Sequence, residues 1–570
     1  MRAILSRETG AIRKPHAGRL RVALAFPNTY NVGMSNLGFQ AAYRLFNERE
    51  EVVCERVFLP PRQELVETGR GRGAGRLFTV ESQSPAGDFD VLAFSVSFEW
   101  DYTNLLTMLR LAGLPLRAAD RNHHHPLVVL GGAVSFLNPE PLAPFVDVVC
   151  VGEGEVLIPD LVATLLASGG RREALAALAL RPGVYVPSLV DVRYGADGRI
   201  AGIAAAPASG AAVPVRKAVV PAAEMRDPPA TVVFTPDTEF GSRLLVEAVR
   251  GCAKLCRFCW AGYNYLPVRP FDADRLLRIA SEARPVASRV GLVSIALCDH
   301  PEIDRILAGL LAMGYGISPA SLRLEELTAP ILKALRDGGE RTITIAPETG
   351  SDRLRRALNK PITNEEILDR ASLAFGAGIE NLKLYFMIGL PTETDEDLVA
   401  IRDLAAAVRD RMLRYGRGRG AAGRIAASVN PLVPKPGTAF QWQPMEEPAV
   451  TERKMRRLRQ LVSGLDHVHF SIKSERHSYY QALLSLGDRR VAAVIEAAER
   501  NGGQWRAAEA EAGVDAAWYV ARDRSGDRLL PWHVVQGGVD DRFLRTEMAR
   551  GLEGTITPRR PAAPRTPGTR

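Results

Sequence analysis

The sequence VEAVRGCAKLCRFCWAGYNY, residues 246–265, carries the clearest chemical signal in the chain. It contains Cys252, Cys256 and Cys259, which have the spacing Cys-x3-Cys-x2-Cys. Three thiols so close together cannot all pair as disulfides, whereas soft thiolates can converge on an iron–sulfur cluster or on zinc. A structural zinc site needs a fourth ligand nearby, and no Cys or His lies between Cys259 and Cys298. A four-iron cubane normally takes four thiolates, so three would leave one iron open to a ligand from outside the protein.

Short apolar strands alternate with helical segments around and after these cysteines. We expect strands at 243–249, 289–297, 316–322, 341–347, 381–389 and 424–432. Two helices begin with capping signatures, Thr363 with Glu366 and Thr394 with Asp397. About six βα units at this spacing favour a partial (β/α) barrel over a flat sheet, although periodicity alone does not separate the two.

A second alternating series precedes the cysteines. Strand-like runs lie near 21–26, 52–60, 90–98, 126–132 and 146–151, and helical segments or glycine turns separate most of them. Such βαβ units predict an open, doubly wound α/β domain with a parallel sheet. The irregular stretch at 185–235 indicates a connector with a few short strands.

The patterns together predict the following organisation. We expect a basic N-terminal tail at 1–20, a doubly wound domain at 21–185, a connector at 186–235, a partial barrel at 236–450, a small, mostly helical C-terminal region at 451–547 and a disordered tail at 548–570. A Gly/Arg-rich loop is expected near 69–76.

The composition is that of an ordinary globular protein, with 46% apolar and 24% charged residues. It excludes collagen-like, wholly disordered and disulfide-scaffold proteins. No apolar run is long enough for a transmembrane helix, and the N-terminus lacks the apolar core of a signal peptide, so we expect a cytoplasmic protein. Residues 1–21 carry a net charge of +5 and residues 551–570 carry +3, which accounts for the total of +8. Two solvated tails are therefore expected; RNA stays open as a partner, but the neutral body does not indicate it.

The cysteine spacing resembles that of the radical SAM superfamily, which carries it after the first strand of a partial barrel. The resemblance implies that S-adenosylmethionine (SAM) binds the open iron of a 4Fe-4S cluster through its amino and carboxylate groups. An electron from the cluster, supplied by a donor such as flavodoxin or ferredoxin, would then cleave SAM to a 5′-deoxyadenosyl radical. Phe258 matches the aromatic residue that the superfamily places before the third cysteine, near the adenine.

Two later segments resemble the SAM-contacting segments of these barrels. Glu348, in APETGSDRLRRALNK (346–360), would bind a ribose hydroxyl or the amino group; the alternative is a carboxylate held at a helix N-terminus. Ile388 and Gly389, in YFMIGLPTET (385–394), would flank the adenine.

Two basic residues and three cysteines complete the candidates in the barrel and beyond it. Arg323 and Lys383, which we expect at strand ends, are candidates for the SAM carboxylate. Cys298 is expected to be a small buried residue rather than a ligand, and Cys54 and Cys150 are expected in the core of the first domain.

The first domain resembles the cobalamin-binding Rossmann-like module that precedes many radical SAM barrels. The candidate cobalamin contacts are Gly33, Ser95, Gly131, Gly132 and Glu153. The loop after the first strand lacks the Asp-x-His-x-x-Gly motif of proteins that ligate cobalt with histidine. It therefore also stays open that the domain has kept the cobalamin-binding fold but no longer binds cobalamin. The run His123–His125 is expected in an exposed loop.

Three function classes follow from these features. The first is a radical SAM enzyme, with a cobalamin-dependent methyltransferase acting at an unactivated carbon as one form of it. The second is a cobalamin-independent radical SAM enzyme that modifies tRNA or a ribosomal component; methylthiotransferases of this kind carry a second three-cysteine cluster, which Cys54 and Cys150 cannot supply. The third is a non-catalytic iron–sulfur protein, which would need no barrel cavity. The sequence does not reveal the substrate.

Overall fold

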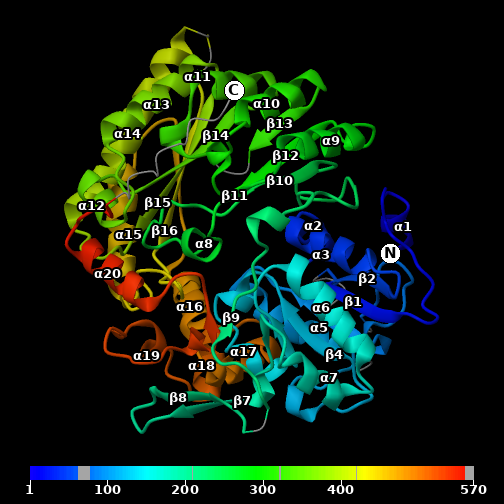
Figure 1. The fold of residues 1–570 in the computed structure, drawn as a ribbon. Helices are drawn as coiled ribbons and strands as arrows, with labels where there is room; N and C mark the ends of the chain where they lie inside the picture. Colours follow the sequence, from blue (N-terminus) through cyan, green and yellow to red (C-terminus); the bar gives the residue numbers. More distant parts are fainter. Residues whose placement is uncertain (62–76, 208, 320–321, 419, 421, 559–570) are drawn as a thin grey trace, which may run out of the picture.

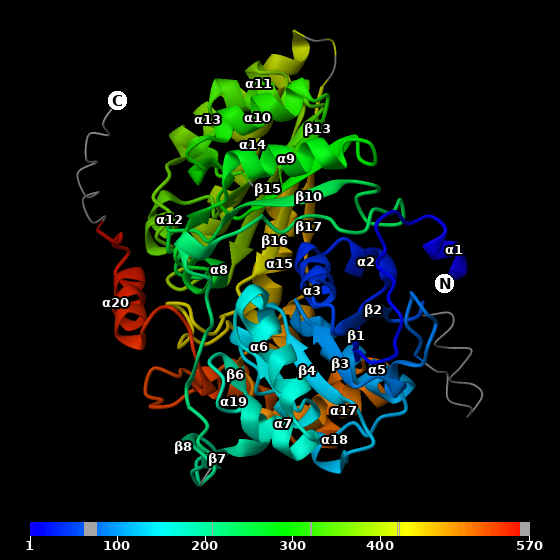
Figure 2. The same ribbon diagram turned by 45° about the vertical axis from the view of Figure 1, so that its right-hand side comes forward.

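The computed structural model describes residues 1–570 except 62–76, 208, 320–321, 419, 421 and 559–570. The Gly/Arg-rich loop predicted near 69–76 lies outside the described residues, as does the end of the chain. Figures 1 and 2 show two bodies of α/β structure, with the C-terminal helices lying against both.

Apolar runs in the first part of the chain form a six-stranded sheet with the order β2-β1-β3-β4-β5-β6. Its strands are β1 (Leu20–Phe26), β2 (Val52–Phe58), β3 (Val91–Ser95), β4 (Leu127–Gly131), β5 (Val148–Cys150) and β6 (Val184–Tyr185). Only β6 runs antiparallel to its neighbour. The doubly wound fold is thus confirmed, and the strand order reverses between β1 and β3, where such sheets bind ligands.

Helices cover both faces of this sheet. On one face α3 (Leu37–Asn47) and α6 (Gly154–Ala167) share a core with β1 and β4. On the other face α5 (Tyr102–Leu111) packs beside α17 (Ala492–Arg500), which comes from the C-terminal region. The C-terminal helices therefore complete the core of the first body.

The second body is the expected partial barrel, formed by parallel strands in two sheets. One sheet contains β10 (Leu244–Arg250), β12 (Arg289–Ser294) and β13 (Gly316–Pro319), with the short antiparallel β11 (Arg269–Pro270) at its edge. The other contains β14 (Thr342–Glu348), β15 (Asn381–Ile388), β16 (Ile425–Pro431) and β17 (Val468–Ile472). Strand β17 lies in the region expected to be helical; its alternation of Val468, Phe470 and Ile472 with polar residues is a short strand signal.

Helices pack against the outer face of these strands and bury its apolar side chains. They are α9 (Ala273–Ala283), α10 (Ile303–Ala312), α11 (Ala329–Asp337), α13 (Asn364–Gly376), α14 (Asp395–Arg417) and α15 (Pro448–Val462). The expected capping box at the start of α13 is present: the Glu366 N–H donates to Thr363 Oγ1, and the Thr363 N–H donates to the Glu366 carboxylate. Among the described residues, no helix has the combined length and apolarity that crossing a membrane requires.

The connector contains β7 (Val190–Tyr194) and β8 (Ile200–Ala205), which form an antiparallel pair, and β9 (Val215–Arg216). Strand β9 pairs with β18 (Val535–Gln536). The connector is therefore tied to the C-terminal region and does not hang free.

The N-terminal segment differs from the solvated tail that its charge suggested. Glu8 forms a buried ion pair with Arg56 of β2 at 2.7 Å. Lys14 Nζ donates to the carbonyls of Asn47, Arg49 and Val52. Glu8 thus neutralises a buried arginine of β2, and Lys14 binds carbonyls between the end of α3 and the start of β2, which explains why the segment lies on the sheet.

The predicted boundary of the C-terminal tail at 547 also needs correction. Helix α20 (Asp541–Leu552) continues past it, because the Asp540 side chain caps its start and Leu544 and Glu547 are buried. Beyond the helix, the Thr557 N–H donates to Asn359.

Candidate active site

The three cysteines lie in the loop that leaves β10 and enters α8 (Trp260–Asn264). Gly251 starts this loop with φ +94°, and a Cβ there would lie 2.4 Å from the Tyr265 carbonyl oxygen, so the turn requires glycine. Burial raises the pKa of Cys256 to about 12. The loop therefore places three thiols, of the buried Cys252 and the half-buried Cys256 and Cys259, at the carboxyl end of the first barrel strand.

Arg257, between two of the cysteines, fixes this loop from within. Its guanidinium is fully buried and forms an ion pair with the equally buried Glu547 of α20, at 3.1 Å. Arg257 Nη1 also donates to the Ala357 carbonyl at 2.9 Å. The side chain of Asn359 donates to the carbonyls of Lys254 and Leu255. No sequence signal pointed to this clamp, because its partners come from distant parts of the chain.

The chemistry of the donors fits an iron–sulfur cluster. Among the residues that the structure describes, no three His, Cys, Asp or Glu side chains are grouped as ligands of a single metal ion. A four-iron cubane instead takes each thiolate on a different iron. Cys252, Cys256 and Cys259 supply three thiols from one loop, and the Arg323 guanidinium lies beside them, with Nη1 3.7 Å from Cys252 Sγ.

Glu348 ends β14 on the side of the barrel where the cysteine loop lies. It adopts φ +67° at an irregularity in the pairing of β14 with β15. A non-glycine residue in this region of backbone space is strained, and such strain gathers at functional sites. Its carboxylate accepts a hydrogen bond from Lys360 Nζ at 2.9 Å. The positive charge of Lys360 also offsets part of the rise that burial causes in the pKa of Cys256.

The remaining SAM candidates differ in what they can reach. Phe258 packs on the apolar cluster that contains Leu390 and Phe440. Gly389 has φ +72°, and its N–H donates to Glu393 Oε2 at 2.7 Å. The Ile388 side chain is fully buried in the core beneath the helices, so only its backbone can face a ligand.

The two basic candidates are not equivalent. Arg323 follows β13 and forms ion pairs with Asp299 and Glu326. Lys383 was expected to end a strand, but it is the third residue of β15. Glu348 pairs with Phe386, so Lys383 lies about 10 Å farther from the carboxyl end at 3.3 Å per residue. Strand β15 begins at Asn381, as the sequence pattern indicated, so Lys383 lies near the amino end of the strand and away from the SAM site.

A cavity of about 570 Å³ lies between the first sheet and the barrel. Its inner part lies above Leu24, Ala93 and Val129 of β1, β3 and β4, and α3 and α6 form its walls. Its outer part is lined by barrel residues that include Glu247, Arg250, Tyr265 and Ser294. The cavity therefore begins at the reversal of strand order and ends beside the cysteine loop.

Four of the five cobalamin candidates line this cavity: Ser95, Gly131, Gly132 and Glu153. Gly33 does not; a Cβ there would lie 2.4 Å from the Phe58 ring, so it is a packing glycine. Gly132 has φ +89° and a Cβ there would lie 2.4 Å from the Val96 carbonyl oxygen, so its own backbone requires glycine. Gly131 has no such restriction, since the nearest atom to its Cβ would be 3.8 Å away.

Glu153 joins the two bodies at the edge of the cavity. Its carboxylate forms ion pairs with Arg269 at 2.5 Å and with Arg250 at 3.1 Å. It also accepts a hydrogen bond from the Val220 N–H. Its charge is therefore already compensated within the protein.

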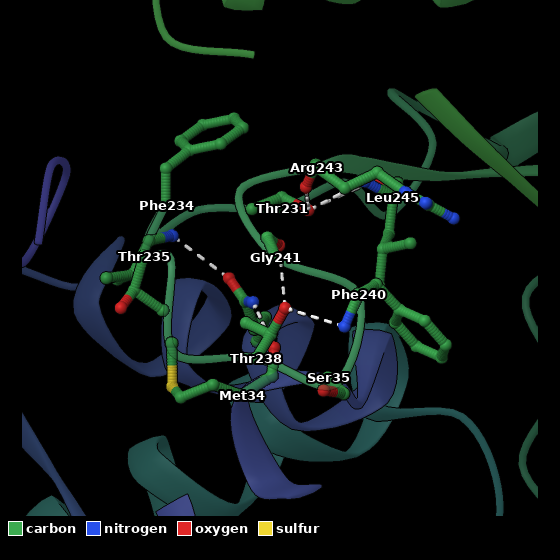
Figure 3. A pocket seen from close by; sticks show the side chains of 12 residues that line it. Met34, Ser35, Thr231, Phe234, Thr235, Thr238, Phe240, Gly241, Arg243 and Leu245 are labelled. Atoms are coloured by element: carbon green, nitrogen blue, oxygen red, sulfur yellow. Dashed lines mark hydrogen bonds between the residues drawn. The ribbon is translucent and has the colours of Figure 1, made fainter. Parts of the chain in front are cut away.

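The other cysteines and histidines have different environments. Cys54 is fully buried in the core, as expected, whereas Cys150 lines the cavity. His123 and His124 are exposed. Figure 3 shows a much smaller pocket, about 10 Å³, where Thr238, Phe240 and other residues of the segment entering β10 meet the first body; it has room for one water molecule.

Two family models match the chain. Residues 38–187 match the model for the N-terminal part of radical SAM proteins, and residues 246–405 match the radical SAM superfamily. The chain belongs to the radical SAM superfamily and is an enzyme of that class, whose cofactors are a 4Fe-4S cluster and SAM.

Two curated relatives and one solved structure are similar to the chain. An uncharacterized protein of Methanocaldococcus jannaschii is 27% identical over 83% of this chain and 90% of its own length. An uncharacterized methyltransferase of Pyrococcus horikoshii is 24% identical over 50% of this chain and 58% of its own length. The methyltransferase TsrM of Kitasatospora setae, solved with cobalamin and a 4Fe-4S cluster, is 13% identical, covers 87% of this chain and 98% of its own, and has a TM-score of 0.53. At that identity the likeness establishes the fold.

The variant Cys298→Ala is expected to keep its iron and to cleave SAM at the wild-type rate. Cys298 packs at the edge of the barrel core, and burial raises the pKa of its thiol to about 12. A fourth thiolate would occupy the iron that SAM needs. Iron per chain and 5′-deoxyadenosine formation test this, and a variant that loses iron would show that the cluster is ligated by four cysteines.

Proposed function

We propose that the protein is a cobalamin-dependent radical SAM methyltransferase, in which Cys252, Cys256 and Cys259 hold the cluster and the 570 Å³ cavity holds cobalamin. The observation that carries the proposal is the position of the cavity. It is lined by both bodies, from the reversal of strand order in the first sheet to Gly251 at the start of the cysteine loop.

The lining of the cavity is suited to a ligand with an apolar and a polar part. The inner part contains small or apolar side chains such as Ala41, Ala93 and Leu161, which leave a slot between the sheet and its helices. The outer part contains Ser95, Ser294 and the backbone at Gly131, which offer hydrogen bonds. Pockets of this kind, mostly apolar with a few polar groups, are typical small-molecule sites.

The residues around the cysteine loop would orient SAM. Glu348 presents a carboxylate, and Gly389, with φ +72°, turns the backbone just past the end of β15. Arg323 brings guanidinium N–H donors beside Cys252, and its charge is balanced by Asp299 and Glu326. When bound, the cluster supplies an electron to SAM and cobalamin carries a methyl group; the protein orients these groups and excludes water. An external reductant such as flavodoxin or ferredoxin would supply the electron.

Equilibrium dialysis against hydroxocobalamin tests the proposal. The wild-type protein, reconstituted with iron under anaerobic conditions, is expected to retain about one cobalamin per chain. The variant Gly131→Trp is expected to bind at least about tenfold more weakly. Its side chain would extend from the end of β4 into the cavity without a backbone clash.

The matched control is Gly526→Trp, because nothing lies within 4 Å of a Cβ at Gly526. Both variants should keep the iron content and melting temperature of the wild type. Absence of retained cobalamin in the wild-type protein, at concentrations well above micromolar, would reject the cobalamin part of the proposal and leave the radical SAM class intact.

A further inference from the structure

The inner face of the sheet β14–β17 is polar. Along β15, Leu382, Leu384 and Phe386 are buried toward the helices, whereas the alternate residues Lys383 and Tyr385 are exposed on the opposite face. Figure 1 shows α13 and α14 on the outer side of this sheet, away from β10, β12 and β13. Lys383 and Tyr385 therefore belong to the face that turns to the interior of the barrel.

The register extends this face across two more strands. Lys383 pairs with Ala426, which pairs with His469. Tyr385 pairs with Ser428, which pairs with Ser471. Neighbouring residues in register share a face of the sheet, so two rows run across β15, β16 and β17: Lys383 and His469 with the small Ala426 between them, and the polar residues Tyr385, Ser428 and Ser471. Asn430 of β16 lies on the same face, one row nearer the carboxyl ends, in register with Met387.

In the described part of the chain, these side chains lack polar partners. Among the described residues, none forms a hydrogen bond or ion pair with the side chains of Lys383, Tyr385, Ser428, His469 or Ser471, and Asn430 Oδ1 is buried without a partner. Barrel interiors are usually filled by layers of Val, Ile and Leu, and parallel sheets are usually covered on both faces. The polar inner face is therefore not covered by other described side chains of the barrel and is suited to contact a polar molecule.

The charges on the inner side are unbalanced. Glu247 is ion-paired with Arg250, and Glu348 with Lys360. Lys383 has no such carboxylate partner among the residues described. The lining thus offers an ammonium group together with hydroxyl, amide and imidazole donors, a set that matches an anionic oxygen group.

Two arginines add to the positive charge at the amino end of the barrel. A Cβ on Gly291, between the outward-facing Val290 and Leu292, would lie 3.3 Å from Arg243 Cδ. A Cβ on Gly316 would lie 3.1 Å from Arg289 Nη1. The Arg289 guanidinium and the aliphatic part of Arg243 are therefore on the inner side, and in the described part of the chain neither side chain forms an ion pair within 4.0 Å.

We infer that the inner face of β15–β17, with Lys383 and His469 in one row and Tyr385, Ser428 and Ser471 in the next, binds a phosphate or carboxylate group of the substrate. The inference rests on the proposed function, since it assigns the substrate of that enzyme. Lys383 lies about 10 Å from the level of Glu348 along the strands. An anionic group held there would leave the rest of the substrate to extend toward the cysteine loop.

Protection of Lys383 against an amine-reactive reagent tests this inference. The holoprotein is treated briefly with acetic anhydride in inorganic phosphate, in succinate or in sodium chloride at equal ionic strength, and acetylation is measured by mass spectrometry. With a Kd near 1 mM, about 10 mM phosphate or succinate should slow the acetylation of Lys383 about tenfold. The anion that protects better distinguishes a phosphate from a carboxylate. Lys333, whose side chain is 71% exposed, is the internal control and should react equally in all three.

The variant His469→Leu keeps Lys383 and removes the other polar residue of its row, two strands away, so protection should fall severalfold while the reaction rate in sodium chloride stays the same. His123→Leu, in an exposed loop, is the matched control. Equal acetylation of Lys383 in all three salts would overturn the inference, as would unchanged protection in His469→Leu. Neither readout requires SAM cleavage or cobalamin binding, so failure here is distinct from failure of the proposed function.

Discussion

The variant Cys256→Ala is expected to form no 5′-deoxyadenosine from SAM above background and to contain less iron than the wild type. Three thiols in one loop leave the cluster no spare ligand, because a cubane that keeps one iron for SAM uses all three. Iron per chain and chromatographic measurement of 5′-deoxyadenosine, both after anaerobic reconstitution, check the expectation.

The matched control is Cys54→Ala. Cys54 is a fully buried cysteine in the core of the first body. Its loss removes packing but no proposed ligand, so iron content and SAM cleavage should stay near those of the wild type. Wild-type cleavage by Cys256→Ala would contradict the assignment of the cluster to this loop.

The variant Glu547→Ala is expected to unfold at lower denaturant concentration and to retain less iron. Arg257 and Glu547 both have side chains with 0% exposure, and removing one partner leaves a buried charge uncompensated. Such a loss costs about 3 kcal/mol or more in the free energy of unfolding. Because Arg257 lies between two cysteines, the cysteine loop should be the first part to lose its structure. Urea unfolding and iron content measure the two effects.

An exposed ion pair provides the comparison. Glu511 pairs with Arg500, and both side chains are more than half exposed. Glu511→Ala should change the free energy of unfolding by less than about 1 kcal/mol and leave the iron content unchanged. If Glu547→Ala behaved like Glu511→Ala, the clamp would have no part in holding the loop.

The central strands of the three large sheets could be predicted from the sequence, because they are apolar runs bounded by glycine turns and capped helices. The cavity-lining residues Ser95, Gly131 and Gly132 could be predicted from the same strands. They lie at the carboxyl ends of strands, and these ends face ligands in such sheets. Strand β17 was missed because it is short and half polar.

Features that depend on distant contacts could not be predicted. The clamp joins Arg257 to Glu547, and nothing local in either segment indicates the other. Lys383 was expected at a strand end beside SAM, although its strand was correctly predicted to start near 381; the register of β14 and β15 places it deeper in the barrel. Gly33 follows a strand, like a ligand-contacting glycine, yet its space is filled by Phe58.

The most direct test of the account is the electron paramagnetic resonance spectrum of the reduced, reconstituted protein before and after addition of SAM. Three protein thiolates leave one iron for SAM, so the account predicts that SAM changes the spectrum of the cluster, in the wild type and in Cys298→Ala alike. A cluster spectrum that SAM leaves unchanged would contradict it, because all the irons would then already have their ligands.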